Sequence, residues 1–357
     1  MENIFIKLFG QKKPVIKENT FLLWEPCSKS HSEVIPGYAK YLRDLGYHVS
    51  VLLTPERYKE GLFARYQDEN ISLNKLNQKD IKKFILKSDL ANVKGILVTT
   101  SGKLCNEIHF DECFEHFNPQ ADRKKLFFVS HDCKNAADNG SWKESLITLR
   151  ELNYKGVKSV VVNPHYFGEI KITPKNNEVT NFITIGAIQG KRNNNELIIN
   201  AAKELHEKGI HNFKITVVGK GHVKKLPKEL QKYFDIKGRL PFDKMYDEIE
   251  KADFILTSYS KGNEQHLRYN TTGTSGTFQL VYGFTKPCII LEEFAPLNGF
   301  NSENAILYSE DKDYSNAFEK GIKMSSEEYS NMQVKLKEYQ EEFYKKSLNN
   351  LKELIND

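Results

Sequence analysis

The residues best suited to chemistry in this sequence lie between Thr271 and Ile290. Small hydroxyl and glycine residues open this stretch, an apolar segment of helical length follows, and Lys286-Pro287 separates it from a short apolar strand. Small residues just before a helix leave its first N–H groups uncovered, so a phosphate-sized anion can bind there. A plain glycine turn entering a helix is the alternative. We call Gly273–Thr277 the cradle and predict that four of its residues bind phosphate: Thr274, Ser275, Gly276 and Thr277.

Length and composition narrow the class of protein. A chain of 357 residues corresponds to about two domains. The net formal charge of +5 is spread among residues of both signs, so no basic stripe for a nucleic acid is indicated. Five cysteines without a C-x-x-C spacing argue against a disulfide framework or a zinc site and fit a reducing cytosol. No apolar run approaches the roughly 20 residues of a membrane span. We therefore expect a soluble, cytoplasmic protein.

Strands and helices alternate along the chain in two series. The first series has apolar runs of strand length at residues 21–24, 48–53, 95–100, 126–130 and 157–162. The second has such runs at residues 181–186, 213–218, 234–240, 253–259 and 288–290. Alternation of this kind is typical of open α/β sheets with parallel strands. The sequence therefore predicts two α/β sheets.

A polar, proline-containing stretch separates the two series. We place a first domain at residues 1–171, a linker at 172–180 and a second domain at 181–324. The spacing of apolar residues in 325–357 predicts a long charged helix with one apolar face. We expect this helix to pack back across both domains. Lysines opposite that face leave a peripheral membrane contact open as an alternative.

Two polar residues directly follow the strand predicted at residues 126–130. His131 is expected to point into the cleft at the carboxyl edge of the sheet, where it serves as a base or binds a sugar. Asp132 is expected to orient it. A hydrogen-bonded structural role for the histidine, and a helix-capping role for the aspartate, are the alternatives.

Several motifs stand in an order that resembles a known family. They are Ile185-Gly186 with Lys191-Arg192, Asn200-Ala201-Ala202, Val217 to Gly221, and Thr285-Lys286-Pro287-Cys288-Ile289. Their order and spacing are similar to the donor domain of GT-B glycosyltransferases of the group 1 type. His131-Asp132 matches that group's usual position for an active-site histidine. The resemblance implies a GT-B α/β fold, with two Rossmann-like domains facing across a cleft.

The resemblance also implies a reaction. A sugar would pass from a nucleotide-diphosphate-sugar donor, UDP- or GDP-linked, to a glycan, lipid-linked or protein acceptor. The donor would bind mainly in the second domain and the acceptor mainly in the first. Members of this group use no cofactor and no metal, and they often build bacterial surface polysaccharides.

Further residues are candidates for contact with the two substrates, and solvated surface charge is the alternative for the basic ones. Beside the cradle, the donor is expected to meet Gly186, Lys191, Arg192 and Arg239. Acceptor contacts are expected on the first strand–helix loop, from His31 and Glu33. Ser30 and Glu33 also have the spacing of a capping box, which is the alternative for Glu33. The transferred sugar is expected to touch a polar cluster in the loop before the cradle: Glu264, His266, Arg268 and Tyr269. A disordered polar loop without a role in binding is the alternative.

One departure from the family pattern keeps other functions open. The group normally has an E-x7-E pair before the Lys-Pro segment, and its second glutamate holds the donor ribose. This chain has Gln279 and Leu280 near that place, so the pair is absent. A non-catalytic GT-B-like subunit that binds a glycan or a partner is therefore one alternative. A sugar-nucleotide epimerase is the other.

Overall fold

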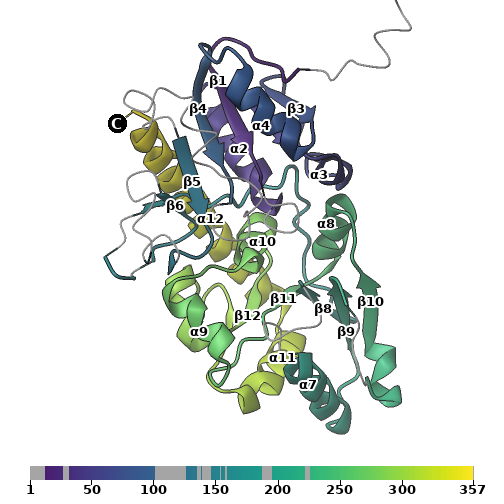
Figure 1. The fold of residues 1–357 in the computed structure, drawn as a ribbon. Helices are drawn as coiled ribbons and strands as arrows, with labels where there is room; N and C mark the ends of the chain where they lie inside the picture. The colour runs from purple at the N-terminus through teal and green to yellow at the C-terminus, as the bar shows by residue number, and fades with distance from the viewer. Residues whose placement is uncertain are drawn as a thin grey trace, which may run out of the picture.

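The chain folds into two parallel β-sheets, each flanked by helices (Figure 1). The computed structural model describes residues 13–26, 32–100, 126–134, 138, 146–152, 154–156, 159–186, 195–221 and 226–356. Within these residues no helix combines the length and apolar character needed to cross a membrane.

The first sheet has the strand order β3-β2-β1-β4-β5-β6-β7, and all its pairs are parallel. Its strands are β1 (Thr20–Trp24), β2 (His48–Leu53), β3 (Ile71–Lys75), β4 (Val93–Val98), β5 (Leu126–Ser130), β6 (Leu146–Thr148) and β7 (Val160–Val161). Its helices are η1 (Ser32–Val34), α2 (Ile35–Asp44), α3 (Pro55–Lys59) and α4 (Gln78–Lys87).

The second sheet has the order β10-β9-β8-β11-β12-β13 and is also parallel. Its strands are β8 (Thr180–Ile185), β9 (Phe213–Val218), β10 (Phe234–Gly238), β11 (Phe254–Leu256), β12 (Cys288–Leu291) and β13 (Ile306–Tyr308). Its helices are α7 (Asn195–Glu207), η4 (Lys228–Tyr233), α8 (Phe242–Lys251), α9 (Glu264–Thr271), α10 (Gly276–Phe284), η5 (Glu292–Phe294), η6 (Pro296–Asn298), η7 (Asp311–Asp313), α11 (Tyr314–Lys323) and α12 (Ser326–Asn356).

Burial on both faces explains why β1 is an unbroken apolar run. Phe21 and Leu23 belong to the core on one side of the first sheet, and Leu22 and Trp24 belong to the core on the other. All four side chains are fully buried. A parallel sheet covered by helices on both faces favours continuous apolar strands over alternating ones.

The structure adds elements that the sequence patterns did not predict. β3 lies in the charged region 55–90, and only one of its five residues is buried because it is an edge strand. β6 and β13 have only three residues each, too short for a periodic signal. The segment 264–269, expected to be a loop, is helical in α9, where the Asn263 side chain caps the Gln265 N–H at 3.0 Å.

The helix α12 is continuous over 31 residues and contacts both sheets (Figure 1). Near its start, Tyr329 donates a hydrogen bond of 2.7 Å to the Asp253 carbonyl of the second domain. Near its end, Ser347 accepts the Asn163 N–H at 3.1 Å and Leu351 joins the core of the first domain. Its apolar face therefore packs across both domains.

Lys286 ties the connection between the sheets to the second domain. Its ammonium group is fully buried and donates to the Thr173 hydroxyl at 2.8 Å and to the Glu250 carbonyl at 3.0 Å. Burial lowers the pKa of Lys286 from 10.5 to about 8, although the charges of Asp253 and Glu250 oppose that shift. A buried ammonium without a contacting carboxylate disfavours the folded state while it stays protonated.

The Lys286→Met variant tests this placement through the pH dependence of stability. As pH rises from about 8 to about 10.5, the folded chain releases the Lys286 proton before the unfolded chain does, so stability rises in that window. Methionine keeps the apolar stem and removes the titration. Urea unfolding at both ends of the window should show the wild type gaining on the order of 1–3 kcal/mol relative to the variant. Equal pH dependence of the two proteins would contradict the assignment.

Candidate functional site

The cradle lies at the start of α10. Ser275 is the N-cap residue, with extended backbone angles of φ −109° and ψ 129°, and its hydroxyl accepts the Thr277 N–H at 3.4 Å. The apolar face of α10 is buried in the second domain, which fixes the direction of the helix. The first N–H groups of a helix have no acceptor within it, and the helix dipole favours negative charge there. The geometry suits an anion.

Backbone hydrogen bonds join the cradle to the first domain. The Thr274 N–H donates to the His131 carbonyl at 3.0 Å, and the Cys133 N–H donates to the Thr272 carbonyl at 2.8 Å. Asp132 and Gly273 thereby form an isolated antiparallel bridge between the loop after β5 and the loop before α10. The sequence-predicted His131 and the cradle are thus brought together at the carboxyl edges of both sheets.

Glu33 of η1 lies against the first residue of α10. A Cβ added to Gly276 would lie 2.8 Å from Oε1 of Glu33, so a larger residue would displace the carboxylate. Burial raises the pKa of Glu33, while the nearby charges of His131 and Arg57 act against the rise. Glu33 as a whole residue is half-buried. The described part of the first strand–helix loop therefore places a carboxyl group of raised pKa beside the cradle.

The ring of His131 is oriented by the end of β4. Nε2 lies 3.0 Å from the Thr99 carbonyl, and the side chain is only 8% exposed. A carbonyl oxygen can only accept, so Nε2 carries the proton and Nδ1 is the basic nitrogen of the neutral ring.

Asp132 pairs with the second domain. Its carboxylate lies 3.6 Å from Nη2 of Arg268, and its Oδ1 accepts the Lys134 N–H at 3.1 Å. The Thr99 carbonyl holds Nε2 of His131, and orientation of the ring by Asp132 stays a prediction. Asp132 reinforces the bridge that joins the cradle to the first domain.

The polar cluster of α9 divides into inward and outward residues. His266 is fully buried, and its Nδ1 accepts the Ser260 N–H at 2.9 Å. This hydrogen bond gives the ring a structural role in the turn that leads into α9. Tyr269 is 8% exposed and lies beneath the Arg268 guanidinium, 5.2 Å from ring centroid to Cζ. Glu264 is exposed. Contact with a transferred sugar stays a prediction for the accessible members, Glu264 and Arg268.

Three predicted residues lie outside the described parts of the chain: His31, Lys191 and Arg192. Gly186 directly follows β8 and lies within the described part of the chain. Its carbonyl would be 1.5 Å from a Cβ on Gly219, so the ends of β8 and β9 approach each other as backbones alone. Only glycine at position 219 permits that approach, which leaves this part of the edge free of side chains.

Arg239 bridges the domains instead of standing free for a nucleotide. Its Nη2 lies 2.6 Å from Oε1 of Glu60, which follows α3 in the first domain. Glu60 also accepts the Phe242 N–H through its carbonyl at 2.8 Å. The Arg239 side chain is 56% exposed, so a ligand can reach it. Its contact with a donor stays a prediction.

Arg150 is a site residue that the sequence patterns missed. It follows β6, is 6% exposed, and donates through Nη2 to the carbonyls of Tyr269 and, at 2.9 Å, Gly273. An arginine directly after an apolar run was the available signal, but the run Leu146–Leu149 is short and was not predicted as a strand. A buried arginine of the first domain thus contacts the backbone of the cradle.

Gln279 and Leu280 are both buried. They stand near the place where the family has the second glutamate of its E-x7-E pair. With its amide in the orientation that satisfies its neighbours, Gln279 donates to the Ser275 carbonyl at 2.8 Å and accepts from Asn163 at 3.3 Å. Leu280 is 3% exposed in the core of the second domain. Neither side chain is placed to hold a ribose.

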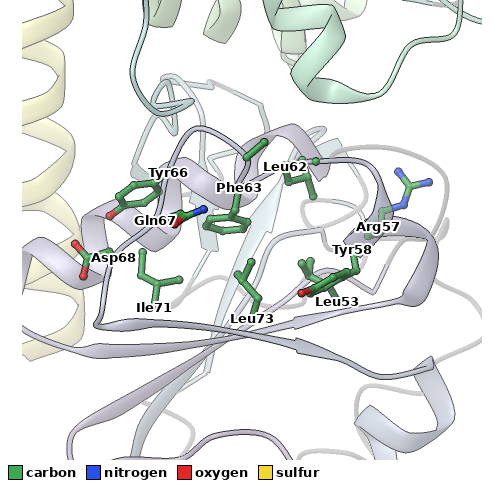
Figure 2. A pocket seen from close by; sticks show the side chains of 12 residues that line it. Leu53, Arg57, Tyr58, Leu62, Phe63, Tyr66, Gln67, Asp68, Ile71 and Leu73 are labelled. Carbon is green, nitrogen blue, oxygen red and sulfur yellow. The ribbon is translucent and has the colours of Figure 1, made fainter.

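A separate pocket of about 350 Å³ opens in the first domain (Figure 2). Apolar side chains of β3 and of the segment after α3 line it, with Arg57 at one end and Asp68 at the other (Figure 2). Arg57 also donates to the Ser32 hydroxyl at 3.0 Å, next to Glu33. The pocket is therefore linked to the acceptor-side loop through one arginine.

Solved glycosyltransferase structures match nearly the whole chain. An α-glucosyltransferase in complex with UDP and a 13-mer DNA containing a HMU base has a TM-score of 0.59 and 9% identity, covering 96% of this chain and 100% of its own. The pneumococcal O-GlcNAc transferase GtfA in complex with UDP and GlcNAc has a TM-score of 0.57 and 11% identity, with coverages of 95% and 98%. The apo form of the lipopolysaccharide outer core galactosyltransferase WaaB has a TM-score of 0.53 and 11% identity, covering 95% of this chain and 99% of its own. The chain has the GT-B fold.

The likeness is one of fold. Family models and curated protein sequences give no match to this chain. At identities of 9–11%, the three structures show that the chain shares the two-domain GT-B architecture, and they do not show its substrates. Activity must be argued from the site, because one fold hosts many functions.

The contact between Glu33 and Gly276 can be tested by a double-mutant cycle. Gly276→Ala places a methyl group against the carboxylate and should cost about 1–3 kcal/mol of unfolding free energy. Glu33→Ala opens the space, so Gly276→Ala should cost roughly half as much or less in that background. The measurement is urea unfolding of the four proteins. Additive effects within about 0.5 kcal/mol would show that the two residues do not touch.

Proposed function

We propose that the chain is a glycosyltransferase that moves a sugar from a nucleoside-diphosphate donor to an acceptor hydroxyl. The observation that carries the proposal is the meeting of the α10 N-terminus with His131 and Glu33 at the facing edges of the two sheets. A leaving diphosphate requires an anion site, and an acceptor hydroxyl requires a proton acceptor beside it. This place provides both groups.

The donor would bind with its diphosphate at the N-terminus of α10. Two of the similar solved structures are complexes with UDP, which supports a nucleotide-sugar donor with a UDP-like or GDP-like leaving group. The helix dipole and uncovered N–H groups stabilise the negative charge that develops as the bond from sugar carbon to phosphate oxygen breaks. Lys191 and Arg192 would add positive charge from the loop after β8.

The acceptor would approach from the first domain. The acceptor oxygen forms a bond to the sugar carbon, the nucleoside diphosphate leaves with the bonding electron pair, and the hydroxyl proton passes to Glu33. A carboxylate whose pKa is raised by burial is a stronger base than an exposed one. His131, beside the cradle, would contact the sugar. The acceptor is a glycan, a lipid-linked sugar or a protein, in keeping with surface polysaccharide or glycoconjugate synthesis.

A thermal-shift panel of UDP, GDP, CMP and their sugars tests the donor site. A nucleotide that binds the folded state raises the melting temperature by mass action. We expect stabilisation by one nucleoside diphosphate and its sugars, with less effect from CMP. His131→Ala should keep the stabilisation by the nucleoside diphosphate itself and lose turnover. Absence of any nucleotide effect would overturn the donor site, and a new sugar nucleotide formed from donor alone would indicate an epimerase.

Glu33→Gln separates catalysis from binding. Loss of the proton acceptor should lower kcat by roughly 10²- to 10⁴-fold. Removal of a negative charge beside the anion site should leave nucleoside-diphosphate binding unchanged or tighter. Product release gives kcat and calorimetry gives Kd, with the exposed Glu69→Gln as a control that should match the wild type. Full turnover by Glu33→Gln would remove the carboxylate from the mechanism.

A further inference from the structure

Arg150 connects the first domain to the cradle through backbone carbonyls alone. Its Nη2 donates to the Tyr269 carbonyl at the end of α9 and to the Gly273 carbonyl, and Nη1 donates to the Glu151 carbonyl at 2.8 Å. Two of these three acceptors belong to the second domain. The guanidinium therefore holds the turn that leads into α10 from across the domain boundary.

The Arg150 guanidinium has no carboxylate partner among the described residues. Within the parts of the chain that the structure describes, no carboxylate lies within ion-pair distance of Arg150, and the groups that affect its charge are Cys133 and Tyr282. Burial lowers the pKa of Arg150 to about 10, so it remains cationic at neutral pH. A buried charge without a counter-ion is costly, and an anion bound close by would offset part of that cost.

Two unpartnered polar atoms mark the same place. Nε of Arg150 and Oγ1 of Thr274 are both buried without a hydrogen-bond partner among the described residues, and both residues line a small cavity of about 20 Å³. Thr274 is 9% exposed. Arg150 thus lies beside the cradle itself and not merely beside α9.

We propose that Arg150 is a positioning residue that gives the cradle its diphosphate-binding shape and supplies the uncompensated positive charge behind it. The inference rests on the proposed donor site at α10. It adds that the site is completed by the first domain, because the second domain contributes the N–H groups and the first domain contributes a buried cation behind them. A diphosphate should therefore bind tightly only when the two domains are in contact.

The test compares the diphosphate and nucleoside parts of one ligand. Kd is measured by calorimetry for the nucleoside diphosphate that the wild type binds, UDP or GDP, and for the corresponding nucleoside. Arg150→Met should weaken diphosphate binding by roughly tenfold or more, and nucleoside binding by less than about twofold. Arg150→Lys keeps the charge without the two-pronged geometry and should fall between. Hydrogen exchange of the 269–276 amides should increase in both variants.

The matched control is Arg65→Met. Arg65 also joins the domains, through Asp247 and Glu250 at 2.6 Å each, but at the edge of the cleft near α8. The Arg65→Met variant should leave the ratio of diphosphate affinity to nucleoside affinity unchanged. Equal loss of both affinities in the Arg150 variants would show a merely structural role and overturn the inference. If Arg150→Met fails to fold, Arg150→Lys decides by the same ratio. A wild type that binds no nucleotide would refute the donor site instead.

Discussion

The hydrogen bond from the Thr274 N–H to the His131 carbonyl joins the carboxyl edges of two separate sheets. With its neighbour from Cys133 to Thr272, it fixes the distance between the loop after β5 and the start of α10. Parallel strands all end at one edge, so a bridge between two such edges gathers side chains that are far apart in sequence. Glu33 and Arg150 come to the same place because η1 and β6 end at the bridged edge of the first sheet.

Two groups of the first domain, with opposite charges, lie against the cradle. Arg150 contributes a buried cation on the carbonyl side of Gly273, and Glu33 contributes a carboxyl group against Gly276. The two groups act in opposite senses on a bound diphosphate. Burial raises the pKa of Glu33 and lowers the pKa of Arg150, because both charges are partly removed from water. Ligand binding would favour the charge of the arginine and disfavour that of the glutamate.

The sequence predicted the parts of the site that depend on local pattern. The apolar run 126–130 placed His131 at a strand end, and the small residues of the cradle predicted the start of α10. Arg150 could not be predicted, because three-residue strands such as β6 carry no periodicity and its partners are backbone carbonyls more than 100 residues away in the sequence. Asp132 was assigned to His131 by sequence proximity, and its pairing with Arg268 of the other domain was not predicted.

The course of α12 limits how the two domains can move. The helix is held to the second domain near Tyr329 and to the first near Ser347 and Asn350, which donates to the Val161 carbonyl at 2.9 Å. A continuous helix resists stretching, so its middle, around Tyr339 and Phe343, should act as the pivot of any rotation. These two residues line the same small cavity as Arg150. A pivot so close to the cradle would keep that region nearly still, and the ion pair between Arg239 and Glu60 would be among the contacts that a rotation breaks.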